Sequence, residues 1–325
     1  MPSPNPLLRV EKITKVYKTG YWKKRTCVAL DNVSFELEAG RTLAVVGESG
    51  SGKSTLCRAA LGLTPLTSGR VVFEGRNLAG LNGDLKVFRR RTQMVFQDAD
   101  GALNPRMIVR QLLLEPARIH KLPLADPDQW TTALLKQVNL TSDLLCRHPH
   151  ELSGGQRQRL SLARAVSLSP RLIAADEPIA SLDRSAQAEA LVLMKEIQAS
   201  TNTAILYVTH DLRTLKYLAH YVAVMYLGAF VEYGPLEEIL GRPLHPYTRA
   251  MLASAGLGDG QNPHAVFLTT DPCSSFNIPS GCRFHPRCPD AVGICSRQKP
   301  SLIAVSGQRS VACLALETSA TPTIA

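Results

Sequence analysis

An α/β fold built around a parallel sheet is predicted from three observations. Residues 41–46 form a short apolar run that ends at a glycine-rich loop, and a helical pattern over residues 54–63 follows it. Apolar runs recur at residues 172–175 and 204–208, with a helical pattern over residues 184–199 between them. Continuous apolar runs of this length are typical of strands that are buried on both faces. Strand, helix and strand in alternation indicate that these strands pair in parallel.

Strand character also precedes this core, and a helical stretch interrupts it. Residues 7–17 alternate apolar and polar side chains like an edge strand, and residues 28–37 form a second strand after a basic loop. Between about residues 84 and 165 the pattern turns helical. The helical segments are separated by Pro105, Pro116, Pro123, Pro127 and Pro149. Since prolines end helices, the sequence predicts an insertion of several short helices between the two halves of the sheet.

The composition limits where the protein acts. The 325 residues carry a net charge of +10, which fits an anionic partner such as nucleic acid or the cytoplasmic membrane surface, or simply a basic surface. The longest apolar candidate, residues 221–231, contains Gly228 and falls short of the roughly 18 residues that a membrane span needs. The first residues lack the basic and apolar regions of a secretory signal. We therefore expect a cytoplasmic protein with reduced thiols.

The glycine-rich loop has the spacing of an ATP-binding phosphate loop. The pattern G-x-x-x-x-G-K-[ST] is matched at every position, and the loop consists of Gly47, Glu48, Ser49, Gly50, Ser51, Gly52, Lys53, Ser54 and Thr55. The glycines let backbone N–H groups and the following helix N-terminus face phosphate oxygens. In such a loop Lys53 reaches the β- and γ-phosphates, and the Ser54 hydroxyl is a ligand of Mg²⁺.

Two acidic residues end the apolar run at residues 172–175. In an open α/β sheet the carboxyl end of a strand faces the ligand crevice, so Asp176 and Glu177 are candidate site residues. We expect Asp176 to hold Mg²⁺ directly or through water, and Glu177 to act as the general base toward the attacking water. An acidic pair after a strand is often only a helix cap, but the phosphate loop favours the catalytic interpretation.

A second anion-binding turn identifies a family. Ser153, Gly154, Gly155 and Gln156 open a helix about 100 residues after Lys53, although one nucleotide needs only one phosphate loop. With this turn, residues 7–255 closely resemble the ATPases of ATP-binding-cassette (ABC) transporters. The resemblance implies a RecA-like P-loop NTPase core, an antiparallel β subdomain and a helical subdomain at about residues 98–165, all within a nucleotide-binding domain of residues 1–255. It also implies a head-to-tail pair of ATPases, in which this turn contacts the partner's ATP.

Further residues match the family's motifs. Tyr17 matches the aromatic residue that stacks on adenine, and Gln97 matches the glutamine that contacts Mg²⁺ and senses the membrane partner. Asp183 matches the loop that crosses the dimer interface, although the order Ala180-Ser181 reverses the commoner Ser-Ala. His210 matches the histidine that contacts the γ-phosphate. The resemblance thus implies catalysis by Glu177 and His210, with Mg²⁺ at Ser54, Gln97 and Asp176.

Residues 256–325 differ in character, because they are rich in Gly, Pro, Ser and Cys and cannot form a core alone. Five, six and seventeen residues separate the four cysteines Cys282, Cys288, Cys295 and Cys313. This spacing does not match the close pairs of zinc modules. We expect a [4Fe–4S] cluster on these cysteines, as in some ATPase subunits of peptide and nickel importers, which this tail resembles. Zinc, another metal or reduced thiols are the alternatives, and Cys273 is not expected to be a ligand. Arg283 and Arg287 would offset the charge of such a site or lie in solvent.

The resemblance implies the energy-coupling ATPase of an importer, with di- or oligopeptides as the expected cargo. Nickel or metal-chelate import is the alternative, and a nucleic-acid-associated ABC ATPase is a distant one. The implied partners are a second, distinct ATPase subunit, two membrane permease subunits and an extracytoplasmic substrate-binding protein, without nucleic acid. We therefore expect a peripheral protein on the cytoplasmic face of the inner (plasma) membrane.

Overall fold

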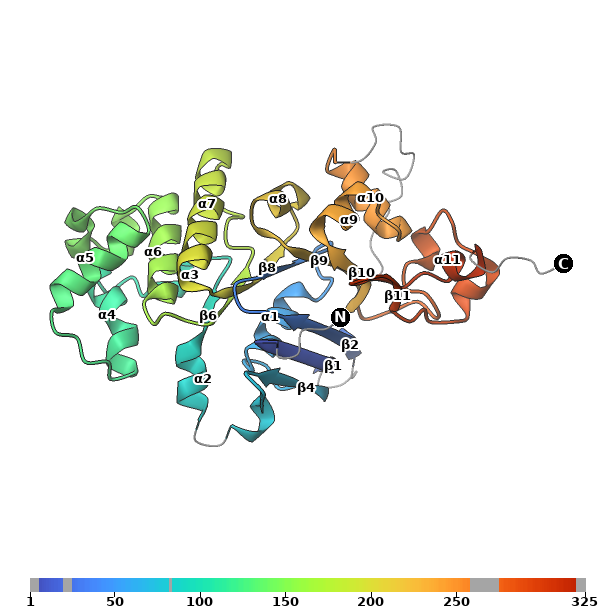
Figure 1. Cartoon of the computed structure of the whole chain (residues 1–325), viewed down its shortest axis with the longest axis horizontal. Coiled ribbons are helices and arrows are strands. Elements are labelled where there is room, and N and C mark those ends of the chain that lie inside the picture. Colours follow the sequence, from blue (N-terminus) through green and yellow to red (C-terminus); the bar gives the residue numbers. More distant parts are fainter. Residues whose placement is uncertain (1–5, 20–24, 82–83, 258–274, 320–325) are drawn as a thin grey trace.

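The computed structural model describes residues 6–19, 25–81, 84–257 and 275–319, and in these ranges two sheets form the body of the protein (Figure 1). One is a mixed sheet of order β11-β12-β10-β9-β3-β8-β7-β6, and the other has the order β2-β1-β4-β5. The strands are β1 (Leu8–Thr19), β2 (Arg25–Leu37), β3 (Thr42–Val46), β4 (Ser68–Phe73), β5 (Arg76–Asn77), β6 (Thr92–Val95), β7 (Leu172–Asp176), β8 (Ala204–Thr209), β9 (Tyr221–Tyr226), β10 (Ala229–Pro235), β11 (Ile303–Ser306) and β12 (Arg309–Val311). The helices are α1 (Lys53–Ala60), α2 (Leu85–Arg91), α3 (Ala99–Ala102), α4 (Val109–Ile119), α5 (Pro127–Gln137), α6 (Gly154–Val166), α7 (Arg184–Thr201), α8 (Leu215–Leu218), α9 (Leu236–Gly241), α10 (Pro246–Ser254) and α11 (Leu314–Ser319).

The centre of the mixed sheet is parallel, which confirms the predicted α/β class. Strand β3 pairs in parallel with β8 and β9, and β7 pairs in parallel with β8 and β6. All five residues of β3 are buried. Leu43 and Val45 pack into one hydrophobic core, and Ala44 and Val46 pack into the other on the opposite face. The continuous apolar run therefore reflects burial on both faces of the sheet.

The second sheet is antiparallel, and it corrects one expectation about its first strand. Strand β1 pairs with both β2 and β4, so it lies inside this sheet and not at its edge. Its alternating pattern reports one buried and one more exposed face, and a central strand of a half-solvated sheet shows the same alternation as an edge strand. The apolar side, with Leu8, Val10 and Ile13, packs into the core that also contains α1.

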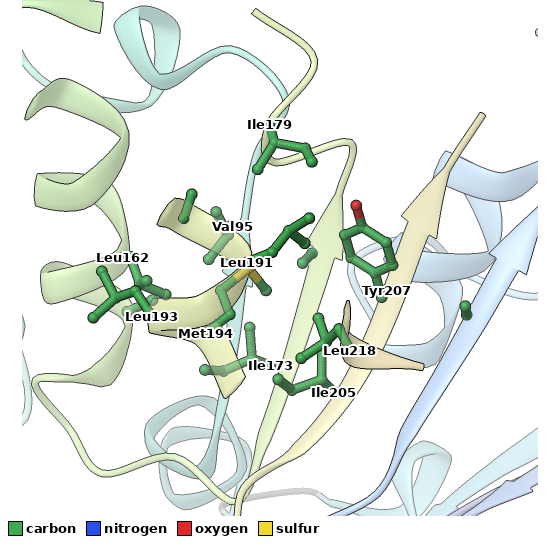
Figure 2. Close-up of a cluster of buried hydrophobic side chains, with 14 of the residues drawn as sticks. Val95, Leu162, Ile173, Ile179, Leu191, Leu193, Met194, Ile205, Tyr207 and Leu218 are labelled. Atoms are coloured by element: carbon green, nitrogen blue, oxygen red, sulfur yellow. The ribbon is translucent and has the colours of Figure 1, made fainter. Parts of the chain in front are cut away.

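Helices cover the other face of the mixed sheet. In Figure 2, Ile173 of β7 and Ile205 and Tyr207 of β8 face Leu191 and Met194 of α7. The helices α3 to α6 lie between β6 and β7 along the chain, as predicted, but the expected helical range of about residues 84–165 also contains the short strand β6 of the mixed sheet. None of the helices in the described ranges has the length and apolar character needed to cross a membrane.

The described part of the C-terminal tail folds onto the main body. Strand β12 pairs with β10, where Glu232 faces Val311, and β11 adds to β12 at the sheet edge (Figure 1). Phe284 is 1% exposed and belongs to the same hydrophobic core as α7. A segment with too few apolar residues for its own core thus packs against the core of the main body.

Candidate active site

The phosphate loop leaves the buried strand β3 and ends at α1, as predicted. A Cβ atom on Gly47 would lie 2.2 Å from the carbonyl oxygen of Met225, and one on Gly52 would lie 2.2 Å from that of Ala29. Gly52 caps α1 with a φ of +107°, a conformation that side chains rarely adopt. Only glycine fits these two positions, and the loop is thereby placed at a helix N-terminus, where free N–H groups favour an anion.

Lys53 is held beneath this loop. Lys53 is only 5% exposed, and its Nζ donates to the carbonyl oxygens of Gly47 at 2.8 Å and Glu48 at 2.9 Å. Burial lowers the pKa of Lys53, and the carboxylates of Glu177 and Asp176 act in the opposite direction. A phosphate group would compensate the buried ammonium, so Lys53 is suited to bind one.

Ser54 and Asp176, which are predicted to be cation ligands, contact one another. The Ser54 hydroxyl donates to Oδ1 of Asp176 at 2.9 Å, and Asp176 is 4% exposed at the end of β7. Burial raises the pKa of Asp176, and the hydrogen bond from Ser54 partly offsets this rise. A hydroxyl and a carboxylate are oxygen ligands of the kind that Mg²⁺ prefers, so the pair fits this ion.

Glu177 and His210 form the second pair at the same edge of the sheet. Oε2 of Glu177 lies 2.9 Å from Nδ1 of His210, and these residues follow the neighbouring strands β7 and β8. Glu177 has a φ of +47°, and its N–H donates to the carbonyl oxygen of Val208 at 2.9 Å. A positive φ outside glycine costs about 1–3 kcal/mol and often marks a functional site.

A cavity of about 560 Å³ joins most of the predicted residues. Its lining includes residues from the phosphate loop, the strand ends and two predicted contacts, namely Tyr17, Ser49, Gly50, Gly52, Lys53, Ser54, Thr55, Gln97, Glu177 and His210. Tyr17 of the antiparallel sheet and Lys53 of α1 thus line one cavity. The volume suits a ligand of nucleotide size.

Some predicted residues do not line this cavity. Ser153, Gly154, Gly155 and Gln156 lie at the N-terminus of α6, where Ser153 and Gln156 form a reciprocal capping box. Asp183 caps α7 by accepting from the N–H of Ala186 at 2.9 Å. A Cβ atom added to Gly155 would lie 3.8 Å from the Cβ of Ala186, so the N-termini of α6 and α7 are close together. In one chain these groups therefore form a separate surface.

Other contacts at the site were not predicted. Cys27 and Ser275 line the cavity, and Ser275 donates from its hydroxyl to the carbonyl oxygen of Gly50 at 3.2 Å. The expectation for the two tail arginines was wrong. Arg283 bonds to Asp31 and Arg287 bonds to Glu48, so both guanidinium groups are buried in ion pairs with the main body. Neither position carries a sequence signal, since ion-pair partners more than 200 residues apart leave no local pattern.

The four predicted cluster cysteines are free thiols in one neighbourhood. The N–H of Cys282 donates to the carbonyl oxygen of Cys295 at 2.7 Å, and burial raises the pKa of Cys288 to about 12. Backbone N–H groups donate to Cys282, Cys288 and Cys313, as they do to thiolate ligands. In the described ranges, however, no group of three or more His, Cys, Asp or Glu side chains is arranged to hold a metal. The described cysteines therefore lie in one neighbourhood without the arrangement of a metal site. Cys273 lies outside the described residues.

This chain is similar to known proteins in family, in sequence and in structure. Residues 30–180 match the ABC transporter family, and residues 231–295 match the C-terminal region of oligopeptide/dipeptide transporters. The chain is 45% identical over 314 residues to the probable peptide ABC transporter ATP-binding protein y4tS of Sinorhizobium fredii, covering 94% of this chain and 89% of that protein. It is 39% identical over 317 residues to the oligopeptide transport ATP-binding protein OppF of Salmonella typhimurium, covering 95% of each chain.

Solved structures agree with these relatives. The ATP-binding cassette MJ0796, in a dimeric post-hydrolysis state bound to ADP and phosphate, matches with a TM-score of 0.64 and 26% identity. That match covers 70% of this chain and 98% of the cassette. CbiO1 of Clostridium perfringens, part of the ABC transporter complex cbiONQ, matches with the same TM-score and 27% identity, covering 73% and 92% of the two chains.

Proposed function

This chain belongs to the ABC transporter family, among the ATP-binding subunits of its peptide transporters, and we propose that it is the ATP-hydrolysing, energy-coupling subunit of an importer for di- or oligopeptides. The cavity beside the phosphate loop carries this proposal, because Lys53, the Ser54–Asp176 pair and the Glu177–His210 pair surround one site. Residues 1–255 would form the nucleotide-binding domain, and residues 256–325 a cysteine-containing extension.

ATP binding is assigned to the phosphate loop. Lys53 and the N–H groups at the N-terminus of α1 would bind the β- and γ-phosphates. Tyr17, which lines the cavity from β1, would stack on the adenine ring. Mg²⁺ held by Ser54 and Asp176, with Gln97 nearby, would supply positive charge to the phosphate oxygens. The hydrogen bond between Ser54 and Asp176 supports this assignment, since it holds both oxygen ligands together.

Hydrolysis is assigned to Glu177 and His210. The carboxylate of Glu177 would accept a proton from water as the water oxygen attacks the γ-phosphorus. The bond between this phosphorus and the β–γ bridging oxygen breaks, and ADP and phosphate result. His210, at 2.9 Å from Glu177, would orient that carboxylate and contact the γ-phosphate. The positive φ of Glu177 supports a functional role, because this conformation is retained against its own strain.

The site would be completed by a second ATPase subunit. The turn of Ser153, Gly154, Gly155 and Gln156 and the interface residue Asp183 lie outside the cavity of their own chain. We propose that they act on ATP bound to the partner, and that the partner is a related but distinct subunit. The dimeric state of the similar cassette MJ0796 supports the pairing, although it does not bear on whether the pair is a heterodimer.

The membrane partners would be two permease subunits that receive peptide from an extracytoplasmic binding protein. A cavity of about 290 Å³ is lined by Leu63, Phe96 and Ile119, among other residues, and Phe96 directly precedes Gln97 in the chain. Leu63, Phe96 and Ile119 are 44%, 41% and 57% exposed, respectively. We propose that a permease helix binds there, which would place the subunit peripherally on the cytoplasmic face of the inner membrane.

We also propose a [4Fe–4S] cluster on Cys282, Cys288, Cys295 and Cys313. The backbone N–H groups that face three of the sulfur atoms support it. Protein purified without oxygen should be brown and contain about four iron atoms. A Cys288→Ser variant should lose the colour, whereas Cys146→Ser, which changes an exposed cysteine outside the group, should keep it. Colourless, iron-free wild-type protein would refute the cluster.

Transport assays test the function as a whole. A strain that lacks this chain should lose uptake of labelled di- or oligopeptides, and the wild-type gene should restore it while the Lys53→Ala gene should not. Loss of nickel uptake with normal peptide uptake would assign the subunit to a metal importer. Copurification with nucleic acid and without integral membrane proteins would contradict the transport function.

A further inference from the structure

One ion pair joins the C-terminal segment to the phosphate loop. Arg287, in the 3-10 turn His285–Arg287, donates from Nη1 to Oε2 of Glu48 at 2.9 Å and from Nη2 to Oε1 at 3.0 Å. Two parallel bonds of this kind are among the strongest side-chain contacts and fix the geometry of both partners. The Arg287 side chain is 4% exposed and that of Glu48 is 23% exposed, so water screens the pair only partly.

The backbone of Glu48 is held on both sides as well. Its N–H donates to the hydroxyl of Tyr247 in α10 at 2.9 Å, and its carbonyl oxygen accepts from Nζ of Lys53 at 2.9 Å. One residue of the loop therefore connects α10, the C-terminal segment and the ammonium group that is assigned to phosphate binding. A displacement of Glu48 would move one of the two carbonyl oxygens that position Lys53.

Aromatic packing holds Arg287 in place. The ring of Phe284 lies 5.4 Å from that of Tyr226, edge to face, and 5.3 Å from that of Tyr247. The guanidinium carbon of Arg287 lies 5.9 Å from the centre of the Tyr226 ring, and Nη1 contacts the Tyr226 hydroxyl at 3.3 Å. The arginine thus comes from a packed surface and also contacts Tyr226, so it is held by contacts besides those with the loop.

The charge of the pair matters for the ligand. Glu48 places a carboxylate in a loop that has to accept the phosphates of ATP, and the two negative charges repel one another. Arg287 neutralises this carboxylate. A guanidinium group is not deprotonated in proteins, so Arg287 carries its charge wherever the protein is folded.

We propose that Arg287 is a positioning residue for nucleotide binding, which holds Glu48 so that the phosphate loop is formed before ATP arrives and which cancels the charge of that glutamate. The inference rests on the proposed ATP binding at this loop. It assigns to the C-terminal segment a direct part in nucleotide affinity. No step of the hydrolysis itself passes through Arg287.

The test measures the affinity of the full-length chain for a fluorescent ATP analogue with Mg²⁺. Arg287→Met should raise the dissociation constant about tenfold, in the range that loss of a charged hydrogen bond produces. Arg287→Lys keeps the charge and loses the parallel bonds, so its dissociation constant should lie between those of the wild type and Arg287→Met. Arg283→Met is the matched control, because it removes a buried guanidinium of the same segment that bonds to Asp31 and Leu227 and not to the loop. In the assembled transporter, Arg287→Met should raise the KM for ATP and change kcat less than twofold.

A double-mutant cycle with Glu48→Gln separates positioning from folding. If Arg287 acts through Glu48, Arg287→Met should weaken binding less in the Glu48→Gln background than in the wild type. Equal loss in both backgrounds, or binding by a folded Arg287→Met chain within twofold of the wild type, would overturn the inference. Should Arg287→Met fail to fold, the Lys variant and the Glu48→Gln single variant carry the same test. Wild-type protein that binds the analogue no better than Lys53→Ala would instead refute the proposed ATP site.

Discussion

Replacing Glu177 with glutamine should abolish hydrolysis and leave ATP binding intact. The two side chains have the same shape, so two contacts of residue 177 can persist. One is the hydrogen bond from its backbone N–H to the carbonyl oxygen of Val208 at 2.9 Å, and the other is the side-chain contact with His210 at 2.9 Å. What is lost is the ability to accept a proton. A general base contributes about 10²- to 10⁴-fold in rate, which corresponds to about 3–5 kcal/mol in the activation free energy. Removal of a negative charge beside the phosphates should also tighten ATP binding slightly.

The assay for this variant is phosphate release in a single turnover by the assembled ATPase pair, with dimer formation followed by size-exclusion chromatography. The Glu177→Gln protein should stay dimeric in ATP and release phosphate at least about 100-fold more slowly than the wild type. Glu237→Gln, an equivalent change on the exposed first turn of α9, is the control and should behave like the wild type. A Glu177→Gln rate within tenfold of the wild-type rate would refute the assignment of the base.

Three further predictions concern a buried ion pair, a buried histidine and the turn that begins at Ser153. Arg309→Met should lower the free energy of unfolding in urea by about 3–5 kcal/mol, because it leaves the fully buried carboxylate of Glu232 without its cation. A Glu232→Gln/Arg309→Met protein that is as unstable as the Arg309→Met protein would contradict this reason. Burial lowers the pKa of His245 to about 3, whereas the pKa of an unfolded histidine is about 6.5. Between these two pH values the unfolded chain binds a proton at this position that the folded chain does not bind. Acidification below pH 6.5 should therefore lower the free energy of unfolding of the wild type by up to about 1.4 kcal/mol per pH unit. His245→Asn, which can still accept the cap bond from the N–H of Tyr247, should show a shallower loss in urea titrations at pH 5 and pH 8, and equal slopes would count against the cause. Ser153→Ala should leave the ATP affinity of the single chain unchanged and reduce hydrolysis by the pair, whereas weaker binding by the single chain would place Ser153 at its own site.

The parallel core and the phosphate loop could be predicted because their signals are local. The run at residues 41–46 is apolar because β3 is buried on both faces, and Gly47 and Gly52 are glycines because a Cβ would collide with carbonyl oxygens. The position of β1 could not be predicted in the same way. Its alternation of side chains reports which face is buried, and it contains no information on how many neighbours the strand has.

The cysteine tail shows the opposite limit. The resemblance of the tail implied a metal site on Cys282, Cys288, Cys295 and Cys313, and the structure brings the thiols into one neighbourhood without ligand geometry. What holds the described tail on the body is different chemistry, namely Phe284 in the core, β12 on β10, and ion pairs from Arg283 and Arg287. These contacts involve residue types that are common in any sequence, so their partners become evident only in three dimensions.

The pair of Glu48 and Arg287 illustrates why a motif describes only part of a binding site. In the pattern of the phosphate loop, the fixed positions are those where a group contacts phosphate or where the backbone must turn, and Glu48 occupies a position that the pattern leaves open. Its partner lies 239 residues away in a segment without periodicity. An open position can nevertheless determine affinity, because the residue there sets how firmly the neighbouring carbonyl holds Lys53 and how much negative charge the incoming phosphates meet. In proteins with this tail, we therefore expect a change of charge at the position of Glu48 to be accompanied by a change at the position of Arg287. A chain that keeps the glutamate beside an uncharged residue at the arginine position, and that still binds ATP equally well, would show that the loop is formed by other means.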